Sequence, residues 1–199
     1  SLAYKIPLIF YAENGEVEYG GNLKKNTSKV TLKEIKRVFL EGGYKKVYDK
    51  LKKKKESLFW FSLPKTKEKN FHITHWSYFE AWDSYRNYLV AKEKCNLREV
   101  EETNHGTFTN FAQNDQALYD LHTYLMYIKF GFGRATQDAG IEIRRGAMTR
   151  DQALNLVGLY DGKYPEKYVQ SYLDYFKMTK VEFDKVIDKW VNKKLFYKC

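Results

Sequence analysis

The chain has 199 residues, of which 43% are hydrophobic and 17% aromatic, so it is long enough and apolar enough to bury a core. This composition excludes an intrinsically disordered protein, which lacks the apolar side chains needed for burial. The formal net charge of +10 predicts either an anionic partner or a well-solvated surface. Much of the excess lies in the lysines of residues 45–55, which we interpret as a solvated helix face, with a nucleic-acid site as the alternative.

The two cysteines, Cys95 and Cys199, lie far apart and have no spacing typical of metal ligands or of a disulfide framework. They are expected to be reduced thiols of a cytoplasmic protein. No apolar run approaches the ~20 residues that a transmembrane helix needs, so no membrane partner is expected. The first residues lack the features of a signal peptide and resemble a strand in the middle of a fold, so we expect a piece of a longer protein.

An apolar run over residues 4–12 predicts a buried strand, and the acidic, glycine-rich loop ENGEVEYGG follows it. Ligand-binding loops of α/β folds follow the carboxyl ends of strands. Carboxylate oxygens are the ligands that magnesium prefers. The loop is therefore a candidate nucleotide and magnesium site, with an ordinary polar loop as the alternative; its candidate residues are Glu13, Asn14, Glu16 and Glu18.

Most of the remaining chain has helical periodicity. Capping boxes predict helix starts at Thr31, Thr149 and Thr179, and residues 83–94 and 115–130 are two further expected helices. We expect about six to eight helices and one strand, which is a mainly α fold with a short amino-terminal β element. In the last helix the apolar face expected to be buried consists of Phe183, Val186, Ile187 and Trp190.

Two segments between the helices contain polar residues without regular periodicity. Residues 101–114 predict a long loop, a type that is often functional, and its segment from Asn104 to Thr107, together with Asn110, could contact a substrate. His72 and His75 have no third ligand at a suitable spacing, so a zinc site is not expected.

Residues 122–147 join two helical segments through a Gly-Phe-Gly-Arg turn. Glycines permit a close approach of the backbone to a ligand, because no Cβ stands in the way. Arg134 offers a planar fork for phosphate or carboxylate, and Asp138, one helical turn later, can orient it. Lys129 adds a second cation just before the turn. These residues predict a site for an anionic substrate, and a structural ion pair is the alternative.

Two more residues of this region are weaker candidates for substrate binding. His122 could act as a general acid or base or as a hydrogen-bond donor, although a helix–helix contact explains it at least as well. Arg145 could bind an anionic group, and a structural ion pair remains a serious alternative for it.

Four segments together span nearly the whole chain: KIPLIFYAENGEVEYGG, WDSYRNYLVAK, GTFTNFAQNDQALYDLHTYLMYIKFGFGRATQDA and IRRGAMTRDQALNLVGLYDGKYP. They resemble the N-acetyl sugar amidotransferases, which are related to the lipopolysaccharide and pseudaminic acid (flagellin-modification) amidotransferases and to other PP-loop ATP pyrophosphatases. The resemblance implies conversion of a sugar N-acetyl group to an acetamidino group. It also implies ATP and magnesium as cofactors, a nucleotide sugar or nonulosonic acid as substrate, and a glutaminase subunit as the ammonia source.

The PP-loop of that family, a Ser-Gly-Gly-x-Asp-Ser pattern after the first strand, is absent from the sequence. The resemblance therefore implies the carboxy-terminal part of a larger α/β enzyme, with the end of the nucleotide-binding sheet in residues 1–30 and a helical substrate-binding domain in residues 31–199. We expect this part to be inactive alone. The alternative function is a basic RNA-binding module of a tRNA-modifying PP-loop enzyme; nucleic acid is otherwise not expected as a partner.

Overall fold

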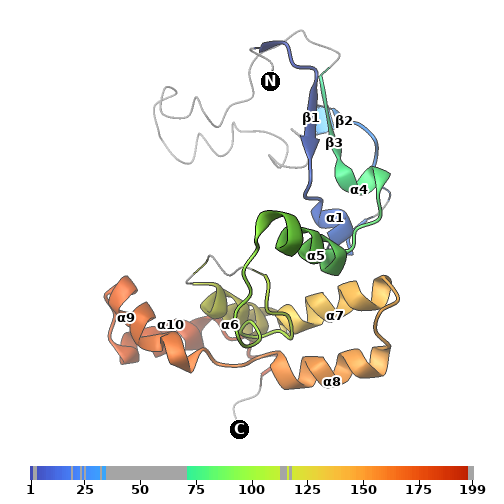
Figure 1. Ribbon diagram of the computed structural model, residues 1–199. Helices are drawn as coiled ribbons and strands as arrows, with labels where there is room; N and C mark the ends of the chain where they lie inside the picture. The colour runs from blue at the N-terminus through green and yellow to red at the C-terminus, as the bar shows by residue number, and fades with distance from the viewer. Residues whose placement is uncertain are drawn as a thin grey trace, which may run out of the picture. The chain divides into compact units, whose positions relative to one another are not determined.

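The computed structural model describes residues 1, 4–18, 20–22, 24, 26–31, 33–34, 71–112, 116 and 118–196 (Figure 1). The chain forms two compact units, Ser1–Trp82 and Asp83–Cys199. The described residues are mainly helical, with a small sheet near the amino terminus, which confirms the predicted fold class. The lysines of residues 45–55 and Cys199 lie outside the described residues, whereas Cys95 is an exposed free thiol.

The first unit contains three short strands and two short helices among its described residues: β1 (Leu8–Tyr11), β2 (Val30–Thr31), β3 (His72–His75), α1 (Gly15–Glu18) and α4 (Trp76–Phe79). The strand order is β1-β3-β2, with β1 parallel and β2 antiparallel to β3. One strand was expected from the sequence. The other two are harder to predict, because β2 has two residues and β3 is a four-residue segment with histidine at both ends.

The strand β1 was expected to be buried, and this prediction is wrong: only Ile9 is partly buried, while Leu8, Phe10 and Tyr11 are exposed. An apolar run is typical of a strand that is buried on both faces, but burial also requires other segments that cover those faces. The sequence boundary expected after residue 30 falls inside the first unit. The assignment of residues 1–30 to a nucleotide-binding sheet therefore stays a prediction.

The second unit is built from helices joined by short turns and one long loop: α5 (Ser84–Cys95), α6 (Tyr119–Phe130), α7 (Arg134–Arg144), α8 (Arg150–Tyr160), the 3₁₀ helix η4 (Glu166–Tyr168), α9 (Val169–Phe176) and α10 (Lys180–Trp190). The predicted helices over 83–94 and 115–130 correspond to α5 and α6, although α6 begins only at Tyr119, four residues later than predicted. Helices α7 and α8 pack against each other as a hairpin (Figure 1).

The predicted capping boxes are present. Thr149 and Thr179 each accept a hydrogen bond from the backbone N–H three residues later, and the side chain of that later residue accepts one from the threonine backbone. Thr31 and Glu34 make the same reciprocal pair of hydrogen bonds. Each box satisfies backbone donors that a helix start leaves without an intrahelical partner.

The core of the second unit lies between α6, α9 and α10, and its buried members are Leu121, Ile128, Tyr172, Leu173, Phe183 and Ile187. The apolar face predicted for the last helix is only half correct, because Val186 and Trp190 are exposed. Phe183 and Ile187 lie one turn apart on the row that faces α6, whereas the other two residues lie on a neighbouring row. Among the described helices, none is both long and apolar enough to cross a membrane.

Candidate functional site

The Gly-Phe-Gly-Arg turn ends α6 at Gly131 and starts α7 at Arg134. Nε of Arg134 lies 2.8 Å from Oδ1 of Asp138, so the pair expected one helical turn apart is formed. Asp138 is buried and Arg134 is mostly buried. A pair of this kind is poorly screened by solvent, and removing either partner would leave an uncompensated charge. The ion pair fixes the direction of the guanidinium, and its role in substrate binding stays a prediction.

A third residue holds this pair from the long loop. Oγ1 of Thr107, which is fully buried, donates a hydrogen bond of 2.5 Å to Oδ2 of Asp138. Burial raises the pKa of Asp138 above its usual range, and the Arg134 charge and the Thr107 hydrogen bond counteract part of that rise. Thr107, Asp138 and Arg134 therefore form one connected unit that links the loop to α7.

The loop itself is an ordered structure in spite of its aperiodic sequence. The backbone N–H of Asn104 donates to the carbonyl of Thr109 at 2.6 Å, and its side-chain oxygen accepts from Ala112 N–H. The carbonyl of Gly106 accepts a hydrogen bond of 3.0 Å from the N–H of Ala135, in the first turn of α7. These bonds hold Thr107 against α7.

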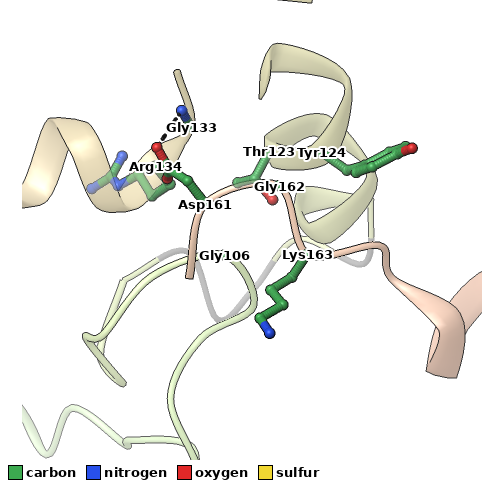
Figure 2. Close-up of a pocket in the computed structure, with 8 residues that line it drawn as sticks. All are labelled: Gly106, Thr123, Tyr124, Gly133, Arg134, Asp161, Gly162 and Lys163. Atoms are coloured by element: carbon green, nitrogen blue, oxygen red, sulfur yellow. Dashed lines mark hydrogen bonds between the residues drawn. The ribbon is translucent and has the colours of Figure 1, made fainter. Parts of the chain in front are cut away.

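The amino terminus of α7 binds a carboxylate of its own chain. Oδ2 of Asp161, the residue after α8, accepts a hydrogen bond of 2.8 Å from Gly133 N–H (Figure 2). It accepts another, of 2.6 Å, from Thr136 Oγ1. Helix amino termini attract anions, and we expected this one to help bind a substrate. Because Asp161 already occupies it, an anionic substrate has to be bound by cationic side chains instead.

The glycines of this region make room for the chain's own side chains rather than for a ligand. A Cβ on Gly133 would lie 2.5 Å from Oδ1 of Asp161, and a Cβ on Gly131 would lie 2.8 Å from Cδ1 of Leu195. Both glycines therefore permit the close approach that was expected from the sequence. The group that approaches, however, is an internal carboxylate or leucine, which the sequence does not reveal.

A small, shallow hollow of about 160 Å³, part of it open solvent, lies where the loop, α6, the start of α7 and the turn after α8 meet (Figure 2). It is lined by Gly106, Thr123, Tyr124, Gly133, Arg134, Asp161, Gly162 and Lys163. Nε2 of His105 donates a 2.7 Å hydrogen bond to the carbonyl of Lys163, which ties the loop to the turn. In Figure 2 the Lys163 side chain extends away from Arg134. Lys163 forms no ion pair with any carboxylate of the described residues.

Sequence reasoning missed Asp161 and Lys163 as site residues. The Asp-Gly pair after α8 indicates the end of that helix, as the structure confirms, but nothing in the spacing indicates that its carboxylate reaches a helix that begins 27 residues earlier. The local sequence offers only a general indication. An aspartate followed by glycine and lysine directly after a helix combines an acceptor, a turn and a cation.

Lys129 does not join the hollow. Its Nζ lies 5.2 Å from the ring centroids of both Phe130 and Trp190, and it is not among the residues that line the hollow. His122 is exposed on α6. Of the five predicted substrate-binding residues in this region, the structure thus brings only Arg134 and Asp138 together.

Arg145 takes part in a network at the other end of α7. Its Nη2 lies 2.5 Å from Oε2 of Glu142, and its Nη1 lies 3.3 Å from Oδ2 of Asp83. Asp83 also caps α5 by accepting a hydrogen bond from Arg86 N–H. This arrangement favours the structural alternative, in which Arg145 joins the carboxyl end of α7 to the start of α5.

The acidic loop of the first unit uses its carboxylates locally. Oε2 of Glu16 accepts from Asn22 N–H at 2.6 Å, and Oε1 of Glu18 accepts from Asn14 N–H at 2.6 Å. Asn14 is buried, and its Nδ2 donates to Oγ of Ser77 in α4, while Glu13 is exposed. No group of three candidate metal ligands occurs among the described residues. The assignment of this loop to a nucleotide and magnesium site stays a prediction.

A family model matches residues 105–199; its description is LPS biosynthesis protein WbpG-like, C-terminal domain. No match is found among curated proteins. The matched segment begins at His105 and contains every residue that lines the hollow. The similarity to lipopolysaccharide biosynthesis proteins, which the sequence motifs predicted, is thus confirmed for this carboxy-terminal segment.

Proposed function

We propose that the chain is the sugar-binding part of an ATP-dependent amidotransferase of lipopolysaccharide or related surface-glycan biosynthesis. The observation that carries the proposal is the match of residues 105–199 to the WbpG-like C-terminal domain, since this segment contains the whole hollow. The proposed substrate is a nucleotide sugar or a nonulosonic acid with an N-acetyl group. The proposed product has an acetamidino group in its place.

In the proposed reaction the N-acetyl carbonyl oxygen displaces pyrophosphate from ATP, and the oxygen becomes bonded to AMP. Ammonia from a glutaminase partner then adds to the activated carbon, and AMP leaves with the former carbonyl oxygen. Under this proposal the ATP phosphates bind outside this chain, because its sequence lacks the PP-loop pattern. The task of this chain is to hold the sugar in one orientation.

We assign the anionic group of the substrate, a carboxylate or a diphosphate, to Lys163 at the edge of the hollow. Arg134, whose direction is fixed by Asp138 and Thr107, is assigned to sugar oxygens, to which a guanidinium can donate two parallel hydrogen bonds. Tyr124 lines the same hollow, and its ring packs edge-on against the ring of Tyr164. A fixed guanidinium and an exposed lysine at the edge of the same hollow suit a ligand that has both a charged group and many hydroxyls.

The test is calorimetric titration of the chain with a UDP-N-acetylhexosamine and with an N-acetylated nonulosonic acid. We expect one of them to bind, Lys163→Gln to weaken binding about tenfold, and Arg134→Lys to weaken it similarly although the charge is kept, since each change removes a charged hydrogen bond. Lys185→Gln, at an exposed position of α10, serves as the matched control. Failure of both ligands to bind, or equal binding by all variants, would contradict the proposal.

The chemistry is tested separately on the longer protein. With ATP, magnesium, ammonia and the sugar that binds, we expect AMP and pyrophosphate to be released in step with a product in which NH replaces oxygen, as detected by mass spectrometry. Steady release of AMP and pyrophosphate by the 199-residue chain alone would contradict the assignment of ATP binding to residues outside it.

A further inference from the structure

A second surface of the helical unit is made of exposed aromatic rings and lysines. It lies at the end of α6, in the turn after it, and at the end of α10. Phe130 is 53% exposed, Phe132 38%, Trp190 53% and Leu195 51%. These four residues, together with Lys129, are called the aromatic patch below. Large exposed apolar groups that lie together mark interaction surfaces more often than isolated ones do.

Several members of the patch lie close to one another. The ammonium of Lys129 lies 5.2 Å from the ring centroids of Phe130 and Trp190, and the rings of Phe130 and Phe132 are stacked 6.0 Å apart. Leu195 packs on the turn, since its Cδ1 lies 2.8 Å from where a Cβ on Gly131 would be. Residues at the end of α6, at the end of α10 and in the segment after α10 thus come close together around Lys129 and Gly131.

The patch also has a fixed backbone. After α10 the chain turns back onto the end of α6, where Asn192 N–H donates to the carbonyl of Ile128 at 2.9 Å. The side-chain Nδ2 of Asn192 donates to the carbonyl of Lys129 at 3.3 Å. The two segments that supply the patch are thus joined by hydrogen bonds, so its shape exists before any partner binds.

Lysines outnumber carboxylates among the charged residues that flank the patch in sequence, where Asp188 is the acidic exception. Lys189, Lys193 and Lys194 are exposed next to it, and the ammonium of Lys189 lies 5.9 Å from the Trp190 ring. In the described part of the chain, neither these three lysines nor Lys129 forms an ion pair with a carboxylate. The surface complements a partner that is both anionic and apolar.

We propose that the aromatic patch docks the protein on the surface of an anionic phospholipid bilayer. Phe130, Trp190 and Leu195 would enter the boundary between headgroups and acyl chains, while the lysines meet the phosphates. The absence of a membrane-spanning segment led us to expect no membrane partner, but surface docking requires no such segment. This proposal is independent of the amidotransferase chemistry.

A single-stranded nucleic acid would also present anionic groups beside flat apolar ones. We favour the bilayer because Phe130 and Phe132 stack on each other with an interplanar angle of 27°, instead of standing apart as platforms for successive bases. Leu195 extends the same surface and cannot stack on a base. Hydrocarbon matches this combination of rings and an aliphatic side chain better than bases do.

The test is co-sedimentation of the 199-residue chain with vesicles of phosphatidylcholine, with and without phosphatidylglycerol. We expect binding to the anionic vesicles alone, and weaker binding as the salt concentration rises. Phe130→Ala combined with Trp190→Ala should reduce binding at least tenfold at every salt concentration. Lys129→Gln combined with Lys189→Gln should reduce it about tenfold at low salt and much less at high salt.

The matched controls are Tyr175→Ala, at an exposed aromatic residue of α9, and Lys185→Gln on α10, both of which should bind as the unchanged chain does. Circular dichroism of each variant verifies that the helices remain. Equal binding to neutral vesicles, equal loss in the controls, or no sedimentation with anionic vesicles would overturn the proposal. Tighter binding of a single-stranded RNA oligonucleotide, lost in the same patch variants, would also overturn it.

Discussion

Three glycines of the helical unit differ in what a Cβ would meet, although all have the same chemistry. Gly162 has φ +79°, and a Cβ there would lie 2.5 Å from Cε1 of Tyr127. Gly146 has φ +77° but faces open space. Gly158 lies within α8 and also faces open space. Gly162 thus tests a steric clash together with backbone strain, Gly146 tests backbone strain alone, and Gly158 tests helix propensity.

Substitution by alanine should therefore give three different results in urea unfolding. Gly162→Ala should cost about 2–4 kcal/mol, because overpacking adds to a left-handed backbone. Gly146→Ala should cost about 1 kcal/mol from the backbone alone. Gly158→Ala should stabilise by up to ~1 kcal/mol, since alanine is the better helix former. Equal costs at Gly162 and Gly146 would mean that the Tyr127 ring moves aside freely.

The titration of Asp138 should make the free energy of unfolding depend on pH, and a single substitution can test this. Its pKa in the folded protein is raised, chiefly by burial, so the folded state holds this proton more tightly than the unfolded state does. Its contribution to stability is fully present below the ordinary aspartate pKa and is lost as the pH rises through the higher folded pKa. Asp138→Asn removes this titration.

We therefore expect the unchanged chain to lose stability relative to Asp138→Asn as the pH rises through that window. Urea unfolding from acid to neutral pH measures it, and Asp151→Asn, at an exposed position of α8, is the control. A difference that shifts in the opposite direction would mean that the Arg134 charge outweighs burial and that the folded pKa is lowered.

Among the elements, α7 and α8 are joined by one carboxylate. Asp161 follows α8 and accepts three hydrogen bonds from the start of α7, two of them from Thr136. Asp161→Ala should cost about 2–4 kcal/mol, because it leaves these donors without their acceptor. Asp151→Ala, at the other end of α8, should cost less than about 1 kcal/mol.

A double-mutant cycle tests whether Asp161 stabilises the fold through its hydrogen bonds to Thr136 or only through a general effect on the stability of α8. Thr136→Val removes one donor, so its cost in the Asp161→Ala background should be smaller than in the unchanged chain by about 1 kcal/mol or more. Additive losses of unfolding free energy, measured by urea unfolding of the four proteins, would show that the Asp161–Thr136 hydrogen bonds do not stabilise the fold. The expected coupling would show that the hairpin positions Arg134 through its neighbours.

The helices could be predicted from the sequence wherever their signals are local. The boxes at Thr149 and Thr179 determine where α8 and α10 begin, because each involves residues only three apart. The Arg134–Asp138 pair was predictable for the same reason. In contrast, the contact between Asp161 and Gly133 spans 28 residues, and the burial of Phe183 without Trp190 depends on where α6 lies. Neither the Asp161–Gly133 contact nor this difference in burial can be predicted from the spacing of nearby residues.

At the scale of the whole molecule, the matched family segment and the compact unit have different starting points. The match begins at residue 105, whereas the unit begins at Asp83 and includes α5. Tyr88 of α5 is buried and stacks on Phe111 of the long loop, with ring centroids 4.2 Å apart. Arg145 reaches back to Asp83. These contacts indicate that the smallest stable unit is longer than the matched segment.

We expect residues 83–199 to fold alone as a cooperative helical domain, and residues 105–199 to be less stable by about 3 kcal/mol or more. The shorter protein loses the Tyr88–Phe111 stack and Asn104, whose hydrogen bonds close the loop that holds Thr107 against Asp138. Urea unfolding followed by circular dichroism measures the difference, and binding of a hydrophobic dye should rise as Phe111 becomes exposed. If residues 105–199 are as stable as residues 83–199, α5 does not contribute to the stability of the domain. With the expected loss, α5 instead helps to hold the loop that fixes Arg134, so the binding site depends on residues before the matched segment.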